Sequence, residues 1–507
     1  MNTRLLGIDV GTSLVKAVVF DLDGTEIAAG SEAVEVQAPH AGWTEQDMEA
    51  VWTATAAAVR AALSASDGAD GIAAVAVAGQ GDGAWMIDGE GRPVAPAPLW
   101  SDGRATAAID RWQQSGALTA HYRKSGTVLW TGSQAALLAW FAEQHPELLD
   151  RAATVFTSKD WIRYRLTDTI GTDETDGSIP FMDLAGRAIS PGQAELVGLE
   201  RYSHLLPPVA RSHDVVGEIT REAAAATGLR SGTPVVAGLL DVAANAVGVG
   251  AIDGDQAMVT LGTTALSAVI LDEPRFEPAD IGASVCHAPA GRWMRALGTM
   301  AGTPNLEWYL DTLGEAIRTE ASAAGREVFA LLEEEVAAAS PGAGGVIYHP
   351  YLLGERNPFA DPDARGTLFG LSMGTTRADV ARAVTEGVSY AVRHCFEAIG
   401  APVAEVRLCG GGARSRTWSQ ILADISGARI IVAAGTQFGA LGAAIVAGVG
   451  VGAYPDYATA VERCVRVERV HQPDPERKAL YDERFELYLD LVEAMGPYWP
   501  RLAGSAT

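Results

Sequence analysis

The sequence predicts an α/β protein of two similar domains, and three observations support this. The chain has 507 residues, which is too many for one hydrophobic core. Apolar runs of strand length alternate with longer segments of helical period. The opening pattern "LLGIDVGTSLVKAVVF" has a short echo in "AMVTLGTTALSAVIL", which begins at residue 257. We place the boundary in the Gly- and Asp-rich stretch 248–255, with domains over residues 1–250 and 251–507.

Composition narrows the class of protein. Hydrophobic residues make up 48% and charged residues 20%, which is typical of a globular protein. The net charge of −25 argues against nucleic acid or an acidic membrane as a partner, because no basic field attracts phosphates. Four cysteines without a C-x-x-C pair exclude a disulfide scaffold and a zinc ribbon. With no secretory leader and no long apolar run, we expect a cytoplasmic protein.

The first half is expected to open with antiparallel strands followed by a long helix. Strands are predicted over residues 5–10 and 14–20, which are apolar and rich in β-branched side chains. The helix is expected to begin with Thr44 as its N-cap and Asp47 three residues later. In the second half, "DVARAVTEGVSYAVRHCFEAI" predicts a long helix.

Two turns of small residues are candidates for phosphate binding. Gly11-Thr12-Ser13 joins the first two strands, directly after Asp9 and Val10, and Gly262-Thr263-Thr264 occupies the same place in the echo. Such tips present consecutive N–H groups and hydroxyls with little bulk, which suits an anion. A plain β-turn is the alternative at each tip.

A third glycine-rich turn lies between a strand and a helix. In "LCGGGARSRTW" the strand ends at Gly410-Gly411-Gly412. Glycines let the backbone approach a ligand, and a helix N-terminus favours an anion or a flat polar ring. A flexible strand-to-helix turn explains the same residues.

Polar residues follow the buried strand 72–79. Gln80 and Asp82 are set among glycines, which suits hydrogen bonding to a hydroxylated ligand, although a simple turn is the alternative. Trp100 and Asp102 follow in "LWSDGR", where the indole is either core or a flat face for sugar C–H groups.

Asp241 lies between an apolar strand and a predicted helix. An aspartate in this position is most often an N-cap. The alternative is a general base at the domain junction, where ligand sites tend to lie.

Two motif matches fail on context. Residues 370–374 fit G-x-S-x-G, but Thr376 and Asp379 predict that the helix begins after the serine, which argues against a serine hydrolase. Residues 448–453 resemble a dinucleotide fingerprint but follow an alanine-rich helix and not a strand.

Together these segments resemble the FGGY family of carbohydrate kinases. The resemblance spans about residues 5 to 450 and rests on "GIDVGTSLVKAVVFD", "GQGDG", "LWSDGRA", "GLLDVAANAVG", "YLLGERNPFADPDARGTLFGL" and "LCGGGARSRTWSQILADISG". The chain looks most like xylulokinases. The resemblance implies two ribonuclease-H-like domains of the actin-like ATPase fold around a deep cleft. It also implies transfer of the γ-phosphoryl of ATP, with Mg²⁺, to a hydroxyl of a small sugar or polyol.

The resemblance also implies roles for residues in both halves. Asp241 matches the general base, and Asp9 matches the aspartate near Mg²⁺ and the phosphates. The nucleotide would contact the two phosphate turns and the adenosine turn, namely Thr12, Ser13, Gly262, Thr263, Thr264, Gly411, Gly412 and Ala413. The sugar would contact Gln80, Gly81, Asp82, Trp100, Asp102 and Asp241.

Two departures bear on the substrate. Gly81-Asp82 replaces the Met-His pair of xylulokinases, and glycerol kinases have an acid at the position of Asp82. We expect Gly81 to open space and the carboxylate of Asp82 to accept hydrogen bonds from two hydroxyls. Gln134 and Leu137 replace a small residue or proline and a lysine.

The sequence therefore predicts the type of reaction but leaves several candidates for the phosphoryl acceptor. A ketopentose such as xylulose is the first expectation, with ribulose, another pentulose, a ketotetrose, erythritol or glycerol as alternatives. A non-catalytic actin-like ATPase or sugar sensor is the alternative of another class, which the presence of both Asp9 and Asp241 disfavours. A homodimer is left open.

Overall fold

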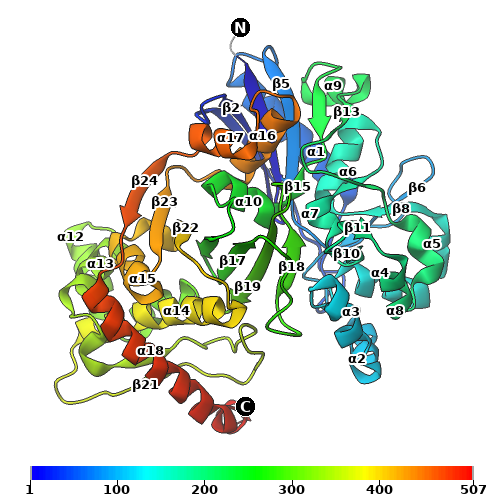
Figure 1. Ribbon diagram of the computed structural model, residues 1–507. Coiled ribbons are helices and arrows are strands. Elements are labelled where there is room, and N and C mark those ends of the chain that lie inside the picture. Colours follow the sequence, from blue (N-terminus) through cyan, green and yellow to red (C-terminus); the bar gives the residue numbers. More distant parts are fainter. Residues whose placement is uncertain (1–2, 505–507) are drawn as a thin grey trace. The chain divides into compact units, whose positions relative to one another are not determined.

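The computed structural model describes residues 3–504, which form two compact units (Figure 1). The first unit contains the chain up to Asp253 together with Leu271–Met294 and Gly435–Arg466. The second unit contains Gly254–Ile270, Arg295–Ala434 and the chain from Val467 onward. The two units are therefore not separated by a single boundary in the sequence, because Gly435–Arg466 packs with the first half of the chain.

The first unit is built on a mixed sheet with strand order β13-β14-β5-β1-β2-β3, and β15 also pairs with β5. The predicted opening strands are present as β1 (Arg4–Val10) and β2 (Leu14–Asp21), which pair antiparallel. On its other side β1 pairs in parallel with β5 (Ile72–Gly79). The other strands of the sheet are β3 (Glu26–Ala33), β13 (Val215–Glu218), β14 (Pro234–Val236) and β15 (Leu239–Leu240).

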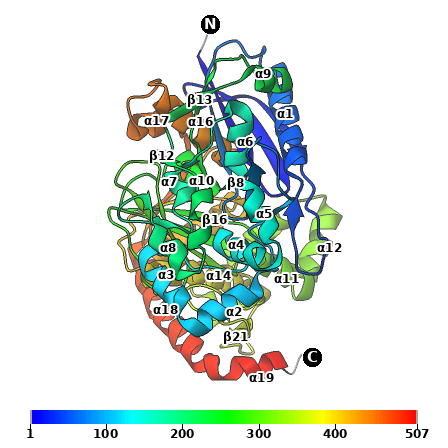
Figure 2. The same cartoon turned by 90° about the vertical axis from the view of Figure 1, so that its right-hand side faces the viewer.

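The two faces of β1 pack against different helices. Leu6, Ile8 and Val10 belong to one buried cluster with the apolar side of α1 (Met48–Ser64), which Figure 2 shows lying along the sheet. The alternate residues face α16 (Phe438–Gly450): a Cβ on Gly7 would lie 1.9 Å from the carbonyl oxygen of Ala440. Because side chains alternate along a strand, Asp9 lies on the α16 face.

The start of α1 differs from the prediction. Its N-cap is Asp47, whose carboxylate accepts hydrogen bonds from the N–H groups of Glu49 and Ala50. Thr44 is not the cap, because β4 (Glu45–Gln46) follows it and pairs with β7 (Ala97–Pro98). The sequence pattern misplaced the boundary by three residues, which moves Gln46 from a helix to a strand.

The second unit repeats the strand pattern of the first. β16 (Gln256–Leu261) pairs antiparallel with β17 (Ala265–Leu271) and in parallel with β22 (Glu405–Cys409), as β1 does with β2 and β5. The sheet continues from β22 to β23 (Arg429–Ala433) and β24 (Val467–His471), and from β17 to β19 (Trp293–Thr299). The predicted echo is therefore a structural repeat.

The long helix of the second unit begins where the sequence predicts. α14 (Arg377–Ile399) has a complete capping box, in which the side chains of Thr376 and Asp379 each accept from the other's backbone N–H. Ser372 lies in the preceding turn and not at a strand-to-helix elbow, which agrees with the rejection of a serine hydrolase.

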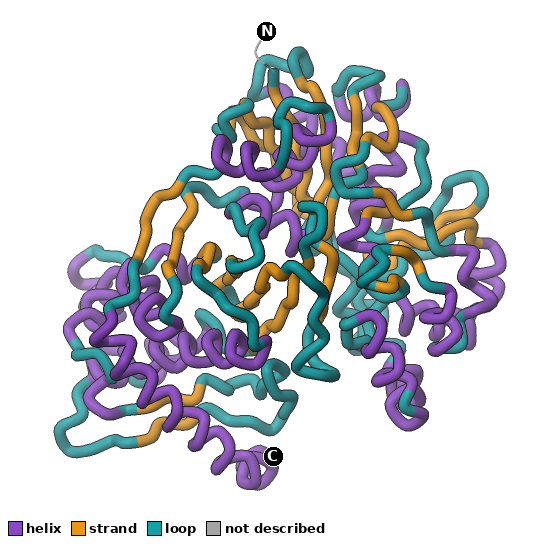
Figure 3. Tube along the Cα trace, viewed as in Figure 1, coloured by secondary structure: helices purple, strands orange, loops and turns teal. Residues whose placement is uncertain are grey.

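The remaining elements complete the two units (Figure 3). In the first unit they are β6 (Trp85–Asp88), α2 (Thr106–Ser115), α3 (Ala117–Ser125), α4 (Gln134–Gln144), α5 (Pro146–Arg151), β8 (Ala152–Phe156), α6 (Ser158–Thr167), β9 (Thr172–Asp173), α7 (Glu174–Gly177), β10 (Met182–Asp183), β11 (Ala188–Ile189), α8 (Pro191–Leu196), η1 (Glu200–Leu205), β12 (Val209–Ala210), α9 (Arg221–Thr227), α10 (Asp241–Val249), β18 (Ala283–Cys286) and α17 (Tyr457–Cys464). In the second they are α11 (Pro304–Thr312), α12 (Glu315–Ala324), α13 (Val328–Ala338), η2 (Ala343–Gly345), β20 (Ile347–His349), β21 (Thr367–Phe369), η3 (Gly411–Arg414), α15 (Arg416–Ser426), α18 (Pro475–Met495), η4 (Gly496–Tyr498) and α19 (Trp499–Gly504). Within residues 3–504 no helix is long and apolar enough to cross a membrane.

Candidate active site

The first unit brings Asp9 and Asp241 close together at the ends of β1 and β15, two strands that each pair with β5. Asp9 is next to last in β1, and Asp241 follows β15 as the first residue of α10. Burial and the nearby charge of Asp9 raise the pKa of Asp241 to about 7, and burial also raises the pKa of Asp9, although Lys16 opposes this. Two carboxylates with raised pKa values in one place are typical of a functional site.

Asp241 is not the N-cap of its helix. The capping position is Leu240, and the Asp241 carboxylate accepts a hydrogen bond from the N–H of Val242 at 2.6 Å. The capping alternative is therefore wrong. The side chain occupies the first helical turn, where backbone N–H groups stabilise a carboxylate.

The two tips of small residues are both present, and they differ in size. At the first tip the N–H of Gly11 donates to the carbonyl of Leu14 at 3.1 Å, and at the second the N–H of Gly262 donates to the carbonyl of Thr264 at 3.1 Å. Ser13 and Thr263 are exposed. The backbone of Gly302 packs closely against the second tip, because a Cβ on Gly302 would lie 2.5 Å from the carbonyl oxygen of Gly262.

Thr12 uses its hydroxyl inside the protein. Its Oγ1 donates to Oε1 of Gln80 at 2.8 Å and accepts from the indole N–H of Trp100 at 3.1 Å. What the first tip offers to an anion is therefore its backbone N–H groups and the hydroxyl of Ser13. The hydrogen bonds join the tip to Gln80 and Trp100, which the sequence assigned to the sugar.

Asp82 is buried and adopts a left-handed backbone conformation, with φ of 55°. Its Oδ1 accepts from the N–H of Gln134, the first residue of α4, at 3.1 Å. Burial raises the pKa of Asp82 to about 7, and this hydrogen bond opposes the shift. Within residues 3–504, Oδ2 has no protein hydrogen-bond partner, so it is the oxygen available to a ligand.

The expected space beside Gly81 is not there. A Cβ on Gly81 would lie 2.5 Å from Cδ1 of Leu240 and 3.2 Å from Oδ1 of Asp176. Gly81 therefore allows these two side chains to approach the strand end and leaves no room for a ligand on that side.

Asp102 makes hydrogen bonds within the protein that hold the segments beside the site together. It is fully buried, and its oxygens accept from the N–H of Thr44 at 2.7 Å and from the backbone and guanidinium of Arg104 at 2.8–2.9 Å. Direct contact of Asp102 with a sugar stays a prediction that this geometry does not favour. Trp100 is 42% exposed, so one of its faces is available.

A buried charge cluster that the sequence did not predict lies behind the Gln80–Asp82 segment. The ammonium group of Lys159 is fully buried and pairs with Asp160 at 2.6 Å and with Asp173 and Asp176 at 3.1 Å. Burial alone would lower the pKa of Lys159, but the charges of the three aspartates raise it above its usual value. Ser158, next to Lys159, donates to the carbonyl of Gln80 at 2.9 Å.

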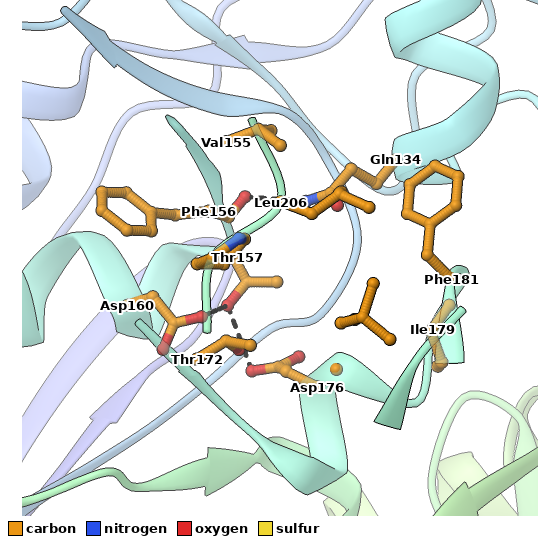
Figure 4. A pocket seen from close by; sticks show the side chains of 13 residues that line it. Gln134, Val155, Phe156, Thr157, Asp160, Thr172, Asp176, Ile179, Phe181 and Leu206 are labelled. Carbon is orange, nitrogen blue, oxygen red and sulfur yellow. Dashed lines mark hydrogen bonds between the residues drawn. The ribbon is translucent and has the colours of Figure 1, made fainter. Parts of the chain in front are cut away.

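Figure 4 shows the adjoining cavity, where the hydroxyl of Thr157 lies between Asp160 and Asp176 at 3.1 Å from each. The cavity measures about 20 Å³, which is enough for one water molecule at most, so it is not a sugar site. The cluster is also joined to Leu240, the residue before Asp241: Asp173 accepts from the hydroxyl of Thr175, and this hydroxyl accepts from the N–H of Leu240.

The second unit contains a cavity of about 550 Å³ beside the glycine turn. Gly410 has φ of 88° and approaches Leu261, whereas a Cβ on Gly411 would meet nothing within 4 Å. Ala413 is buried beneath the turn. The lining comes from α11, α13, α14, η3 and α15, and comprises Thr303, Leu306, Glu307, Glu327, Phe329, Ala330, Leu332, Glu333, Val336, Thr385, Gly411, Gly412, Arg414, Ser415 and Trp418. This volume and mixed lining suit a nucleoside-sized ligand.

Comparison with known protein families identifies both halves of the chain. Residues 4–248 match the N-terminal domain of the FGGY family of carbohydrate kinases, and residues 257–451 match its C-terminal domain. The chain belongs to this family. It is thus a carbohydrate kinase, which transfers a phosphoryl group to an alcohol acceptor, and the prediction of the family and of the enzyme class is confirmed.

Individual relatives carry different substrate names. The chain is 34% identical to the erythritol kinase of Brucella abortus, over 98% of each chain. It is 33% identical to the xylulose kinase of Escherichia coli, over 97% of this chain and 99% of that one. The crystal structure of a xylulose kinase from Rhodospirillum rubrum superposes with a TM-score of 0.87 at 27% identity, over 98% of this chain and 99% of the other. The predicted two-domain α/β fold of the sugar kinases is confirmed.

Proposed function

We propose that this kinase transfers the γ-phosphoryl group of ATP to a hydroxyl of a small sugar or polyol, with Asp241 as the general base. The observation that carries the proposal is the pKa of Asp241, which burial and Asp9 raise to about 7. A base works best when its pKa lies near the operating pH. Asp241 removes the proton of the acceptor hydroxyl as its oxygen attacks phosphorus, and the leaving group is ADP.

The nucleotide is assigned to the turns of small residues. Gly411, Gly412 and Ala413 hold the adenosine beside the cavity of the second unit, where the open side of Gly411 lets a flat ring approach the backbone. The two tips supply N–H groups and hydroxyls to the phosphates, from Thr12, Ser13, Gly262, Thr263 and Thr264. The hydroxyl of Thr12 is engaged within the protein, so its share comes from the backbone.

Asp9 is the residue that would hold Mg²⁺. Mg²⁺ is bound by one or two carboxylates together with phosphates and water, and not by a cage of protein ligands. The site fits this pattern, since Asp9 is a carboxylate two residues before the first phosphate tip, and a cation would stabilise its ionised form, which burial disfavours. Bound Mg²⁺ would supply charge neutralisation on the phosphates.

The acceptor is assigned to Gln80, Asp82, Trp100 and Asp241. A ketopentose such as xylulose is the first candidate, which the similarity to xylulose kinases supports. Erythritol is the second candidate, and a specific feature favours it: when ionised, the free Oδ2 of Asp82 accepts hydrogen bonds and suits a hydroxyl-rich end without a carbonyl. The four cysteines are buried and free, and we infer a reducing, cytoplasmic setting from them.

A coupled assay of ADP release tests the proposal. The acceptors are D- and L-xylulose, ribulose, erythritol and glycerol, each with MgATP. We expect acceptor-dependent ADP release with at least one of them, at a kcat/KM that exceeds the others by tenfold or more. Release of ADP at the same rate without any acceptor would contradict the assignment of a sugar kinase site.

A further inference from the structure

Four side chains that come from four segments of the first unit form a continuous set of hydrogen bonds, which we call the amide ring. The indole N–H of Trp100 donates to Oγ1 of Thr12 at 3.1 Å, and this hydroxyl donates to Oε1 of Gln80 at 2.8 Å. Nε2 of Gln80 donates to Oε1 of Gln46 at 3.1 Å. Nε2 of Gln46 then donates to the backbone carbonyl of Thr12 at 2.8 Å and closes the ring.

The direction of every bond in the amide ring follows from the types of donor and acceptor that it joins. An indole N–H is only a donor, and a carbonyl oxygen is only an acceptor. Because the carbonyl of Thr12 can only accept, Gln46 must present its NH₂ group there and its oxygen to Gln80. Gln80 must in turn present its NH₂ group to Gln46 and its oxygen to Thr12, so the hydroxyl of Thr12 donates to Gln80 and accepts from Trp100. A single amide orientation therefore satisfies both glutamines.

Gln46 is the member that the proposed site does not otherwise use. It is 1% exposed and belongs to the short strand β4, so it has no direct access to a ligand. It contacts the first tip on one side and the acceptor segment on the other, through Thr12 and Gln80. Loss of its side chain would leave the carbonyl of Thr12 and one amide N–H of Gln80 without their partners.

We propose that Gln46 is a positioning residue, which holds the first phosphate tip and the amide of Gln80 in one fixed arrangement so that acceptor and phosphate are presented together. This inference rests on the proposed function, in which Gln80 and Trp100 contact the acceptor and the tip at Thr12 contacts phosphate. Gln46 acts only through these residues and touches neither substrate.

Two substitutions that keep the size of the side chain distinguish the effect of its hydrogen bonds from the effect of its volume. Gln46→Met keeps the length of the side chain and removes both hydrogen bonds. Each hydrogen bond favours the fixed arrangement by a factor of a few, and the groups left unpaired add to the loss. We therefore expect kcat/KM for the acceptor to fall about five- to hundredfold at every pH. Gln46→Glu keeps the acceptor toward Gln80 but, when ionised, has no proton to donate to the carbonyl of Thr12.

The decisive readout is the pH dependence of Gln46→Glu relative to wild type. A protonated carboxyl has one O–H donor and one carbonyl acceptor, which is what the ring requires at this position. The ratio of kcat/KM in Gln46→Glu to that in wild type should therefore rise as the pH falls from 8.5 to 6, by about fivefold or more. The ratio for Gln46→Met should stay constant, since titration of Asp9, Asp82 and Asp241 affects all three proteins alike.

Gln193 provides the matched control. It is also fully buried in the first unit, where its amide donates to the carbonyl of Met182, outside the ring. Gln193→Glu and Gln193→Met should leave the acceptor KM and the pH profile as in wild type. Equal pH profiles for Gln46→Glu and Gln46→Met, or an unchanged kcat/KM in both, would overturn the inference. A wild-type protein without activity on any acceptor would overturn the proposed function as well, which distinguishes the two failures.

Discussion

A carboxylate oxygen of Asp9 lies directly against the backbone of Gly439, in the first turn of α16. A Cβ placed on Gly439 would be 2.7 Å from Oδ2 of Asp9, closer than real contacts allow. The absence of a side chain at residue 439 therefore lets the start of a helix approach the carboxylate. Similar close approaches, of Gly7 to Ala440 and of Gly442 to Ala244, hold α16 against β1 and α10.

We expect Gly439→Ala to impair catalysis while the protein remains folded. The added methyl group must displace the Asp9 carboxylate, which is short and fixed on a strand, and a displaced catalytic group typically costs one to two orders of magnitude in kcat. Alanine favours helix by about 1 kcal/mol over glycine, which offsets part of the strain in the free energy of unfolding. Gly89→Ala is the control, because a Cβ there meets nothing within 4 Å. Equal kcat values in the two variants would contradict this role of Asp9.

Asp241→Asn should abolish phosphorylation of the acceptor and preserve the fold. Removal of a positioned general base costs about 10²–10⁴ in rate. In the wild-type enzyme, kcat/KM should fall as the pH drops below about 7, because burial and Asp9 raise the pKa of Asp241 and protonation inactivates it. Asp110→Asn on an exposed position of α2 is the matched control. Retention of more than about a tenth of wild-type kcat would exclude Asp241 as the base.

Much of the fold follows from local sequence patterns. The hairpins β1–β2 and β16–β17 were predictable because each has two apolar runs around a turn of small residues, and the capping box of α14 fixes its first residue. The same strand ends place Asp9 and Gln80 in the candidate site. The prediction failed at Thr44 because two residues three positions apart can each cap a helix, and the choice between them decides whether Gln46 lies in a helix or in a strand.

Long-range packing could not be predicted in this way. Nothing in the composition of α16 indicates that it packs against β1, since its alanines and glycines also suit an ordinary buried helix. Lys159 follows a serine and precedes an aspartate, which reads as the polar start of a surface helix. Only the fold brings Asp173 and Asp176 to it and so buries the charge.

Gly411→Ala should weaken the binding of ATP and leave the binding of the sugar unaffected. The position has no backbone strain and no neighbour within 4 Å of a Cβ, so the variant should fold normally. The methyl group would occupy part of the space that we assign to the adenine ring, and we expect the KM for ATP to rise about tenfold. Gly496→Ala, also in open space, is the control. An unchanged KM for ATP would place the nucleoside elsewhere.

Asp82→Asn should stabilise the protein at high pH. Burial raises the pKa of Asp82 from 3.8 to about 7, so the folded chain binds more protons than the unfolded chain between these values, and stability falls as the pH rises through this range. Asparagine keeps the acceptor for the N–H of Gln134 and tolerates a positive φ. We expect a gain of at most about 4 kcal/mol at pH 8 and none near pH 4. Thermal unfolding at both pH values, with Asp110→Asn as control, measures the difference; a gain that is equal at the two values would contradict the buried carboxylate.

The same carboxyl should make the choice of acceptor depend on pH. Below about pH 7 Asp82 is protonated, and it can donate a hydrogen bond to the carbonyl oxygen of a ketose. Above this value it is ionised, and it accepts hydrogen bonds from hydroxyls with the extra strength of a charged group. The ratio of kcat/KM for erythritol to that for xylulose should therefore rise between pH 6 and 8.5, by about tenfold. Titration of Asp241 affects both acceptors and cancels in the ratio. Asp82→Asn has no proton to lose, so its ratio should not vary with pH. A ratio that is equally flat in wild type would show that Asp82 only caps α4 through Gln134, and the acceptor would then be selected at Trp100.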